Sequence, residues 1–161
     1  MQTAYFAGGC FWCMEAIFQR VNGVNGLASG YCNGSTENPT YEEICTGQTG
    51  HAEVLKIDFD ELLISYADLL EVFIEVHDPT SLNQQGGDVG IQYRSAVFYI
   101  NTTQKETAES VISGVVGAVT EISPLNVFYP AEGHHQNYYN DNQNQPYCRL
   151  VILPKIQKYF K

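Results

Sequence analysis

The sequence predicts an α+β fold arranged as a two-layer sandwich. Segments with the period of strands alternate with segments that have the period of helices. The helical segments are too few to cover both faces of a parallel sheet, which favours two layers over three. A chain of 161 residues has the usual length of one domain, so we expect residues 1–161 to fold as a single domain.

The N-terminal third predicts strand, helix and strand in that order. Residues 3–7 are β-branched and aromatic, and Gly8-Gly9 ends that strand. Apolar residues then recur at helical spacing between residues 11 and 21. Asn-Gly pairs end this helix, and residues 27–31 form the second expected strand. Apolar and charged residues alternate between residues 51 and 59, which indicates a half-buried strand.

Capping residues mark the starts of three further helices. Thr40 is placed to cap a short helical turn that holds Tyr41, and Ser65 to cap a helix that ends before Asp78-Pro79. Thr103 and Glu106 have the spacing of a capping box for a helix that reaches about residue 119.

Two more strands and the tail complete the expected order of elements. Residues 94–100 predict a strand, and residues 120–129 predict the last one. The order begins with βαββαβ, so we expect a ferredoxin-like core with long coil segments. Residues 143–161 are expected to form an irregular, mobile C-terminal tail, because Pro146 and its polar neighbours interrupt any helix there.

Charge and hydropathy exclude several classes of partner. Eight Lys and Arg stand against 18 Asp and Glu, and the resulting net charge of -10 has the wrong sign for binding nucleic acid. No apolar run approaches the roughly 18 residues of a membrane-spanning helix, so we expect no membrane association. Residues 1–6 lack a basic and an apolar signal region, which favours a cytoplasmic location.

The cysteines direct attention to one thiol. Five cysteines are an odd number, which suits reduced thiols better than a disulfide framework. Cys10 follows Gly8-Gly9 at the start of a predicted helix, where free backbone N–H groups and the helix dipole lower the pKa of a thiol. We therefore expect Cys10 to be reactive, although many cysteines are small buried apolar residues.

The spacing of Cys10 and Cys13 also occurs in zinc sites and in redox motifs. A structural zinc site needs a second ligand pair. Cys32 and Cys45 are separated by 12 residues, and no pair of histidines has zinc-finger spacing. We therefore expect no metal, and thiol redox chemistry remains.

At this point the chain resembles a known family. The run Gly8-Gly9-Cys10-Phe11-Trp12-Cys13-Met14-Glu15 is similar to the active-site signature of the A-type peptide methionine sulfoxide reductases. Six further blocks are similar, in order, over nearly the whole chain: Asn38-Pro39-Thr40-Tyr41, Thr49-Gly50-His51-Ala52-Glu53, His77-Asp78-Pro79-Thr80, Gln85-Gly86-Gly87-Asp88-Val89-Gly90, Gln92-Tyr93-Arg94-Ser95, and Ala131-Glu132 with His135-Gln136. The resemblance implies a two-layer α+β core with long coils.

The resemblance implies a nucleophile and an acid. Cys10 matches the cysteine that attacks the sulfur of methionine sulfoxide and becomes a sulfenic acid while methionine is released. The resemblance implies the S epimer as substrate. The sulfoxide oxygen leaves only when it is protonated, so the site needs an acid. Glu53 matches the family's glutamate and shares the buried parity of Leu55 and Ile57, where desolvation raises the pKa of a carboxyl.

The resemblance also implies the residues that hold the substrate. Tyr41 and Tyr93 match tyrosines that hydrogen-bond the sulfoxide oxygen, and Asp88 matches an aspartate that supports the site. Phe11 and Trp12 match the aromatic pair that holds the substrate methyl group, in keeping with the attraction between sulfur and aromatic rings.

A second cysteine must resolve the sulfenic acid. The resemblance favours Cys148 in the C-terminal tail, and Cys13 is the alternative because it lies one helical turn from Cys10. The tail continues as Val151-Ile152-Leu153-Pro154 instead of the Gly-rich stretch with another cysteine that longer family members carry. The family implies thioredoxin, or another external dithiol, as reductant of the disulfide and no bound cofactor. Its role would be the repair of oxidised proteins, and we expect a monomer.

Two other functions fit parts of the sequence. Cys10 with one of four histidines would suit a hydrolase in which the imidazole acts as base: His51, His77, His134 or His135. Cys10, Cys13 and a histidine would suit a thiol or metal-binding module without catalysis. Release of methionine from methionine sulfoxide with dithiothreitol separates the reductase from both.

Overall fold

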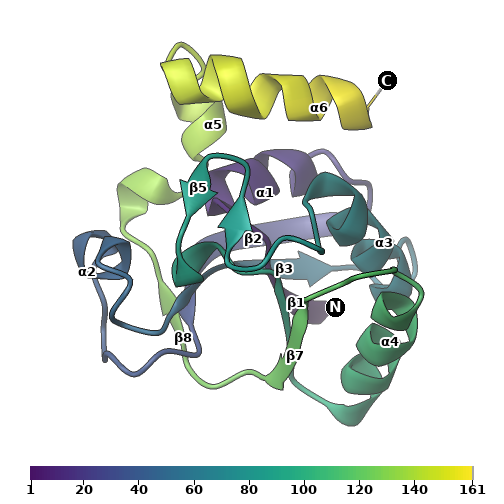
Figure 1. Cartoon of the computed structure of the whole chain (residues 1–161). Helices are drawn as coiled ribbons and strands as arrows, with labels where there is room; N and C mark the ends of the chain where they lie inside the picture. Colours follow the sequence, from purple (N-terminus) through teal and green to yellow (C-terminus); the bar gives the residue numbers. More distant parts are fainter. Residues whose placement is uncertain (161) are drawn as a thin grey trace.

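The computed structural model describes residues 1–160. Within that range, a mixed sheet has the strand order β7-β6-β1-β3-β2-β8 (Figure 1). Its strands are β1 (Gln2–Ala7), β2 (Val24–Cys32), β3 (Ala52–Phe59), β6 (Ala96–Tyr99), β7 (Glu121–Pro124) and β8 (Phe128–Pro130). Neighbouring strands are antiparallel except β6 and β7, which run parallel. The expected α+β class is confirmed.

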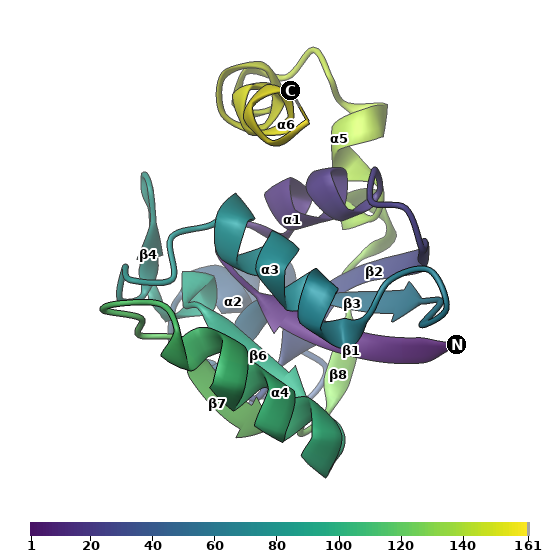
Figure 2. The same ribbon diagram turned by 90° about the vertical axis from the view of Figure 1, so that its right-hand side faces the viewer.

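Helices lie against the sheet and beyond its edges (Figure 2). The longer ones are α1 (Phe11–Phe18), α3 (Tyr66–Val76), α4 (Thr102–Ser113) and α6 (Leu153–Tyr159). Shorter elements are α2 (Tyr41–Cys45), the hairpin β4 (Gln84–Gln85) with β5 (Asp88–Val89), η1 (Ile91–Tyr93), η2 (Gly133–His135), α5 (Tyr138–Asp141) and η3 (Cys148–Ile152). Among residues 1–160, no helix is long and apolar enough to span a membrane.

The main core lies between the sheet and helices α1, α3 and α4. Phe6 of β1 is fully buried and its ring meets Phe73 of α3 at a centroid distance of 4.9 Å. Phe18 of α1 and Leu55 of β3 belong to the same buried cluster. Burying each such side chain stabilises the fold by about 1.5–3 kcal/mol. This packing holds α1 against β1 and β3.

Two of the three expected caps are confirmed. Thr40 and Ser65 each form a capping box, with Glu43 and Asp68 respectively. The expected box at Thr103 and Glu106 is wrong, because the side chain of Asn101 accepts a hydrogen bond from the Gln104 N–H (2.9 Å) and starts α4 at residue 102. This helix ends at Ser113, six residues earlier than the expected limit near residue 119.

The single strand expected at residues 120–129 is also wrong. The segment forms two short strands at opposite edges of the sheet, where β7 pairs with β6 and β8 pairs with β2. Pro124 ends β7, because proline has no N–H to continue the ladder. The chain then crosses to the far edge and brings residues 131–139 beside α1 and α2.

The C-terminal segment is not irregular as expected. Residues 146 and 147 are already helical, and the helix continues through the wide π-turn of η3 into α6. Pro146 is tolerated because it lies in the first turn, where its missing N–H has no intrahelical partner. The resulting helix lies across α1 (Figures 1 and 2). Its expected mobility stays a prediction.

Candidate active site

The Gly8-Gly9 turn places Cys10 at the N-cap of α1, as expected. Gly9 has a φ of +86°, which favours glycine. A Cβ on Gly8 would lie 2.9 Å from Cγ of His77, and one on Gly9 would lie 2.8 Å from Cγ of Gln85. Both glycines are needed so that β1 can turn into α1 at this point.

The pKa of Cys10 differs from the expectation. Burial raises the pKa of the thiol well above its ordinary value, and the neighbouring Cys13 and Glu53 raise it further. Only the backbone N–H of Trp12, at the start of the helix, lowers it. Desolvation thus opposes the expected effect of the helix dipole on this thiol, and the reactivity of Cys10 stays a prediction.

Cys13 lies one helical turn from Cys10, and its backbone N–H donates to the Cys10 carbonyl (3.1 Å). The neighbouring Cys10 thiol lowers the pKa of Cys13 to about 7, against the opposing effect of burial. The charge of Lys155 on α6 and a hydrogen bond with Tyr147 lower the pKa further. The two thiols therefore titrate as a coupled pair, and it is the pair, rather than either cysteine alone, that loses its first proton near neutral pH.

Glu53 lies on β3 next to Cys10. Its side chain is 1% exposed, and Oε1 accepts a hydrogen bond from the Phe11 N–H (3.1 Å). Its Oε2 is buried without a hydrogen-bond partner. Burial raises the pKa of Glu53 to about 8 despite the hydrogen bond from Phe11, so the carboxyl holds a proton at neutral pH. The expected burial of this carboxyl is confirmed.

Tyr41 and Tyr93 face Glu53 from two different elements. Tyr41 is the first residue of α2, and Tyr93 ends η1. Burial raises the pKa of both phenols, and the charge of Glu53 is the next cause for each. The backbone N–H of Tyr41 donates to Oε2 of Glu132 (3.0 Å), which holds the start of α2.

Glu132 was part of a family block but had no expected role. Its Oε1 accepts a hydrogen bond from the hydroxyl of the buried Tyr31 (3.0 Å). Tyr31 is opposite Glu53 in the pairing of β2 with β3. Glu132 thus connects Tyr31, the cross-strand neighbour of Glu53, to Tyr41. No short-range pattern in the sequence indicates this connection.

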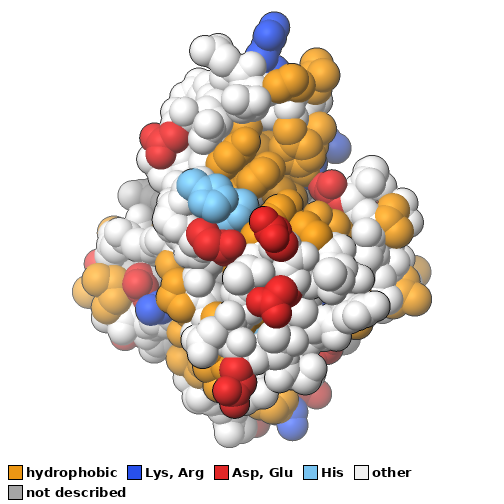
Figure 3. All heavy atoms as spheres, turned by 90° about the vertical axis from the view of Figure 1, so that its left-hand side faces the viewer, with side chains coloured by type: hydrophobic (Ala, Val, Ile, Leu, Met, Phe, Trp, Pro, Cys, Tyr) orange, Lys and Arg blue, Asp and Glu red, His pale blue; other side chains and the backbone are white. Residues whose placement is uncertain are grey.

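Aromatic rings line the site beside Cys10. Phe11 is buried against Tyr31, with ring centroids 5.7 Å apart. Trp12 stacks on Tyr138 of α5 at 3.8 Å and donates a hydrogen bond to His135 (3.2 Å). Figure 3 shows this side of the molecule, where hydrophobic side chains gather beside histidine and acidic side chains lie below them.

Tyr147 reaches the site from the C-terminal helix, and its contact with the site was not predicted from the sequence. Its hydroxyl donates to Oδ2 of Asp88 (2.8 Å) and lies 3.5 Å from Sγ of Cys13. Asp88 is therefore close to the Cys13 thiol, although it lies on the β4–β5 hairpin. The one indication of this role in the sequence is that Tyr147 directly precedes Cys148.

Three of the five cysteines come together. Cys10, Cys13 and Cys148 belong to one buried cluster between α1 and the C-terminal helix. Cys148 is fully buried, which raises the pKa of its thiol. Cys32 lies in a separate buried cluster, and Cys45 is exposed. All five are free thiols in this structure.

Three of the four histidines have side-chain hydrogen bonds in the described residues, and their partners are groups other than Cys10. In residues 1–160, none of their hydrogen bonds goes to Cys10: His51 bonds the backbone of Gly34 and Thr36, His77 bonds Phe73 and Ser95, and His135 bonds Trp12. Within the same range, no three His, Cys, Asp or Glu side chains converge as a metal site would require.

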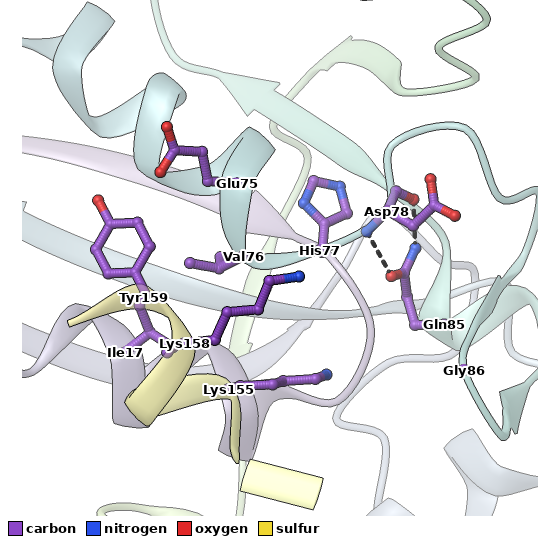
Figure 4. Close-up of a pocket in the computed structure, with 10 residues that line it drawn as sticks. All are labelled: Ile17, Glu75, Val76, His77, Asp78, Gln85, Gly86, Lys155, Lys158 and Tyr159. Carbon is purple, nitrogen blue, oxygen red and sulfur yellow. Dashed lines mark hydrogen bonds between the residues drawn. The ribbon is translucent and has the colours of Figure 1, made fainter. Parts of the chain in front are cut away.

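A separate cavity of about 600 Å³ lies between α3, α6 and the β4 hairpin (Figure 4). It contains neither Cys10 nor Glu53 among its lining residues, which are Ile17, Glu75, Val76, His77, Asp78, Gln85, Gly86, Lys155, Lys158 and Tyr159. Lys155 connects the two regions, because it lines this cavity and its charge also lowers the pKa of Cys13.

The chain is similar to known proteins over its full length. The family model described as peptide methionine sulfoxide reductase matches residues 2–161. A peptide methionine sulfoxide reductase from Vesicomyosocius okutanii is 60% identical over 161 residues, with 99% of each chain covered. Mxr1 from Saccharomyces cerevisiae in reduced form superposes with a TM-score of 0.87 at 30% identity, covering 91% of this chain and 88% of that one.

Mxr1 in complex with Trx2 has the same fold, with a TM-score of 0.61 at 21% identity over 85% of this chain and 84% of that one. The full-length match, the high identity to curated relatives and the shared fold agree with the arrangement of thiols and carboxyl described above. The chain is a member of the peptide methionine sulfoxide reductase family.

Proposed function

We propose that Cys10 is the nucleophile and Glu53 the proton donor with which this enzyme reduces methionine sulfoxide to methionine. The observation that carries this assignment is Oε2 of Glu53, which is buried without a hydrogen-bond partner in a carboxyl whose pKa burial raises to about 8. A sulfoxide oxygen would be its natural acceptor. We assign the S epimer as substrate from the family.

The first step converts a thiol and a sulfoxide into a sulfenic acid and a thioether. The Cys10 sulfur attacks the sulfoxide sulfur, and Glu53 gives a proton to the oxygen. The S–O bond of the substrate breaks as the oxygen passes to Cys10, and the proton that leaves the thiol restores Glu53. The two-electron reduction of the substrate is thus balanced by the oxidation of Cys10 to its sulfenic acid.

The other side chains hold the substrate in this proposal. Tyr41 and Tyr93 donate to the sulfoxide oxygen as it gains negative charge, which is where preorganised donors act most strongly. Phe11 and Trp12 hold the methyl group, and Asp88 supports the site through its hydrogen bond with Tyr147.

We propose that Cys148 resolves the sulfenic acid, with Cys13 as the alternative. The resolving thiol attacks the Cys10 sulfur, a disulfide forms and water leaves. Both thiols share the buried cluster of Cys10, so the resting structure favours neither. Thioredoxin would then reduce the disulfide, and no bound cofactor would take part. The chain shares its fold with Mxr1, which has been solved in complex with Trx2, and this similarity is one of fold alone.

We also propose a setting for the reaction. The central strands β6-β1-β3-β2 with α1 and α3 have the order of a ferredoxin-like βαββαβ unit, within one domain of residues 1–161. We propose a monomer in the cytoplasm that repairs oxidised proteins and also acts on free methionine sulfoxide. The free thiols support a reducing compartment.

Separated epimers of N-acetylmethionine sulfoxide, with dithiothreitol as reductant, test this proposal. The wild type should release N-acetylmethionine from the S epimer, and Cys10→Ser should release none, because a serine hydroxyl is not ionised near neutral pH. Cys32→Ala, which changes a buried cysteine outside the site, is the matched control and should keep wild-type activity. Activity in Cys10→Ser would move the nucleophile elsewhere.

A further inference from the structure

The hydrogen bond between Trp12 and His135 fixes the protonation of the imidazole. Nε1 of Trp12 lies 3.2 Å from Nδ1 of His135. An indole N–H can only donate, so Nδ1 must be the acceptor and the ring proton must be on Nε2. His135 is 3% exposed, and its Nε2 is buried without a hydrogen-bond partner. The side chain is therefore a neutral imidazole whose acceptor nitrogen is committed to Trp12.

His135 also contacts the other rings of the site. Its ring centroid is 4.5 Å from that of Tyr41 and 5.6 Å from that of Phe11. On α5, Tyr138 stacks on Trp12 at 3.8 Å with the two rings nearly parallel. Stacking restricts the tilt of the indole but leaves it free to turn within its own plane. The hydrogen bond to His135 supplies the missing restraint.

We propose that His135 is a positioning residue, which accepts the indole hydrogen bond of Trp12 and holds that ring in the orientation that receives the substrate methyl group. This inference rests on the proposed function in so far as Trp12 binds the methyl group there. The restraint on Trp12 itself does not depend on which reaction the site performs.

The hydrogen bond between Trp12 and His135 should break at acidic pH. An imidazolium carries protons on both nitrogens, so it would present a donor to the donor of Trp12 and break the hydrogen bond. Burial lowers the pKa of His135 below 6.5, and the charge of His134 lowers it further while Glu132 opposes this. Tyr41 on α2 is the remaining titratable neighbour, and α1 presents the non-titrating rings of Phe11 and Trp12. The acceptor is thus preserved at neutral pH.

Two variants separate the nitrogens of His135. In His135→Asn, the side-chain oxygen takes the place of Nδ1, so the acceptor for Trp12 is kept and the titrating ring is lost. In His135→Gln, the amide reaches the place of Nε2, so the acceptor for Trp12 is lost. His134→Asn is the matched control, because this exposed neighbour makes no hydrogen bond with Trp12. Circular dichroism confirms that each variant is folded.

Fluorescence reads the restraint directly, because Trp12 is the single tryptophan of the chain. The wild type and His134→Asn should show the same emission maximum and anisotropy at pH 7.5, with a transition below pH 6.5. His135→Asn should keep the emission and anisotropy at pH 7.5 but lose the transition. His135→Gln should lower the anisotropy and shift the emission to the red already at pH 7.5.

Steady-state kinetics complete the test. His135→Gln should raise KM for N-acetylmethionine sulfoxide by about five- to tenfold, as expected for one lost hydrogen bond, while kcat changes less. His135→Asn should restore KM to within about twofold of the wild type. Equal fluorescence and equal KM in wild type and His135→Gln would overturn the inference. Failure of the wild type to reduce any sulfoxide would instead overturn the proposed function and leave the fluorescence result standing.

Discussion

Burial raises the pKa of both the Cys10 thiol and the Glu53 carboxyl, because desolvation disfavours the charged form of each group. A protonated thiol is a weak nucleophile, whereas a protonated carboxyl is what the sulfoxide oxygen needs. In the proposed mechanism, the thiol therefore loses its proton as the substrate oxygen gains one from Glu53.

Glu53→Gln tests the acid at the residue scale. The amide keeps the acceptor for the Phe11 N–H but has no acidic proton, so sulfenic acid formation should slow by about 10²–10⁴. Single-turnover release of methionine measures this step. Glu109→Gln, a change of an exposed glutamate on α4, should leave the rate unchanged. An unaltered rate in Glu53→Gln would show that another group protonates the oxygen.

The pH dependence of the same step follows from the pKa of Glu53, which is about 8. The donor is protonated below that value and ionised above it, so the single-turnover rate should fall as the pH rises through about 8. Glu53→Gln should lose this alkaline decline along with most of its rate. A wild-type rate that stays constant from pH 7 to 9.5 would contradict the assignment.

Some roles of single residues could be predicted from the sequence and others could not. The burial of Glu53 follows from its parity on a strand, which is a local pattern. The raised pKa of Cys10 could not be read from the helix start, because desolvation depends on the C-terminal helix that covers it. Tyr147 was missed for the same reason, since its partner Asp88 is 59 residues away.

At the scale of elements, the caps at Thr40 and Ser65 were predictable from local signals, whereas the box at Thr103 and the elements determined by distant contacts were not. Thr40 and Ser65 act on donors within three residues, so their helices were predictable. The strands β7 and β8 and the helix after Pro146 are determined by what they pack against, such as α1 for the C-terminal helix. Sequence periodicity carries no information on those partners.

The C-terminal helix and α1 offer the two candidate resolving thiols, and paired variants decide between them. If Cys148 resolves the sulfenic acid, Cys148→Ser should release close to one methionine per enzyme and then stall with thioredoxin, which requires a disulfide. Cys13→Ser should turn over almost normally. Peptide mapping of the oxidised wild type should show a bond between Cys10 and Cys148. An exchange of the two phenotypes and a bond between Cys10 and Cys13 would assign Cys13 instead.

At the scale of the whole molecule, the buried Glu53 lowers the free energy of unfolding at alkaline pH. Glu53 keeps its proton up to about pH 8 in the folded protein, against an ordinary pKa of 4.5. Between these values the unfolded state binds fewer protons, so the free energy of unfolding falls as the pH rises. The loss is on the order of 5 kcal/mol at pH values above 8, because one pKa unit corresponds to about 1.4 kcal/mol.

Glu53→Gln should remove this loss and so be more stable than the wild type at pH 9, while the two differ little at pH 4.5. Urea unfolding at both pH values measures the difference, and Glu109→Gln serves as the exposed control. A pH dependence of stability that is the same in wild type and Glu53→Gln would show that Glu53 ionises freely in the folded protein.

The wide turn at η3 interrupts the α geometry of the C-terminal helix. A π-turn holds one residue more than an α-turn, and Cys148 is its first residue. If that turn relaxed to α geometry, the segment before it would shift by one residue and rotate by about 100° around the helix axis. The Cys148 thiol would then point in a different direction while α6 kept its contacts with α1. If Cys148 is the resolving thiol, its disulfide with Cys10 would thus form by a shift of register within one helix.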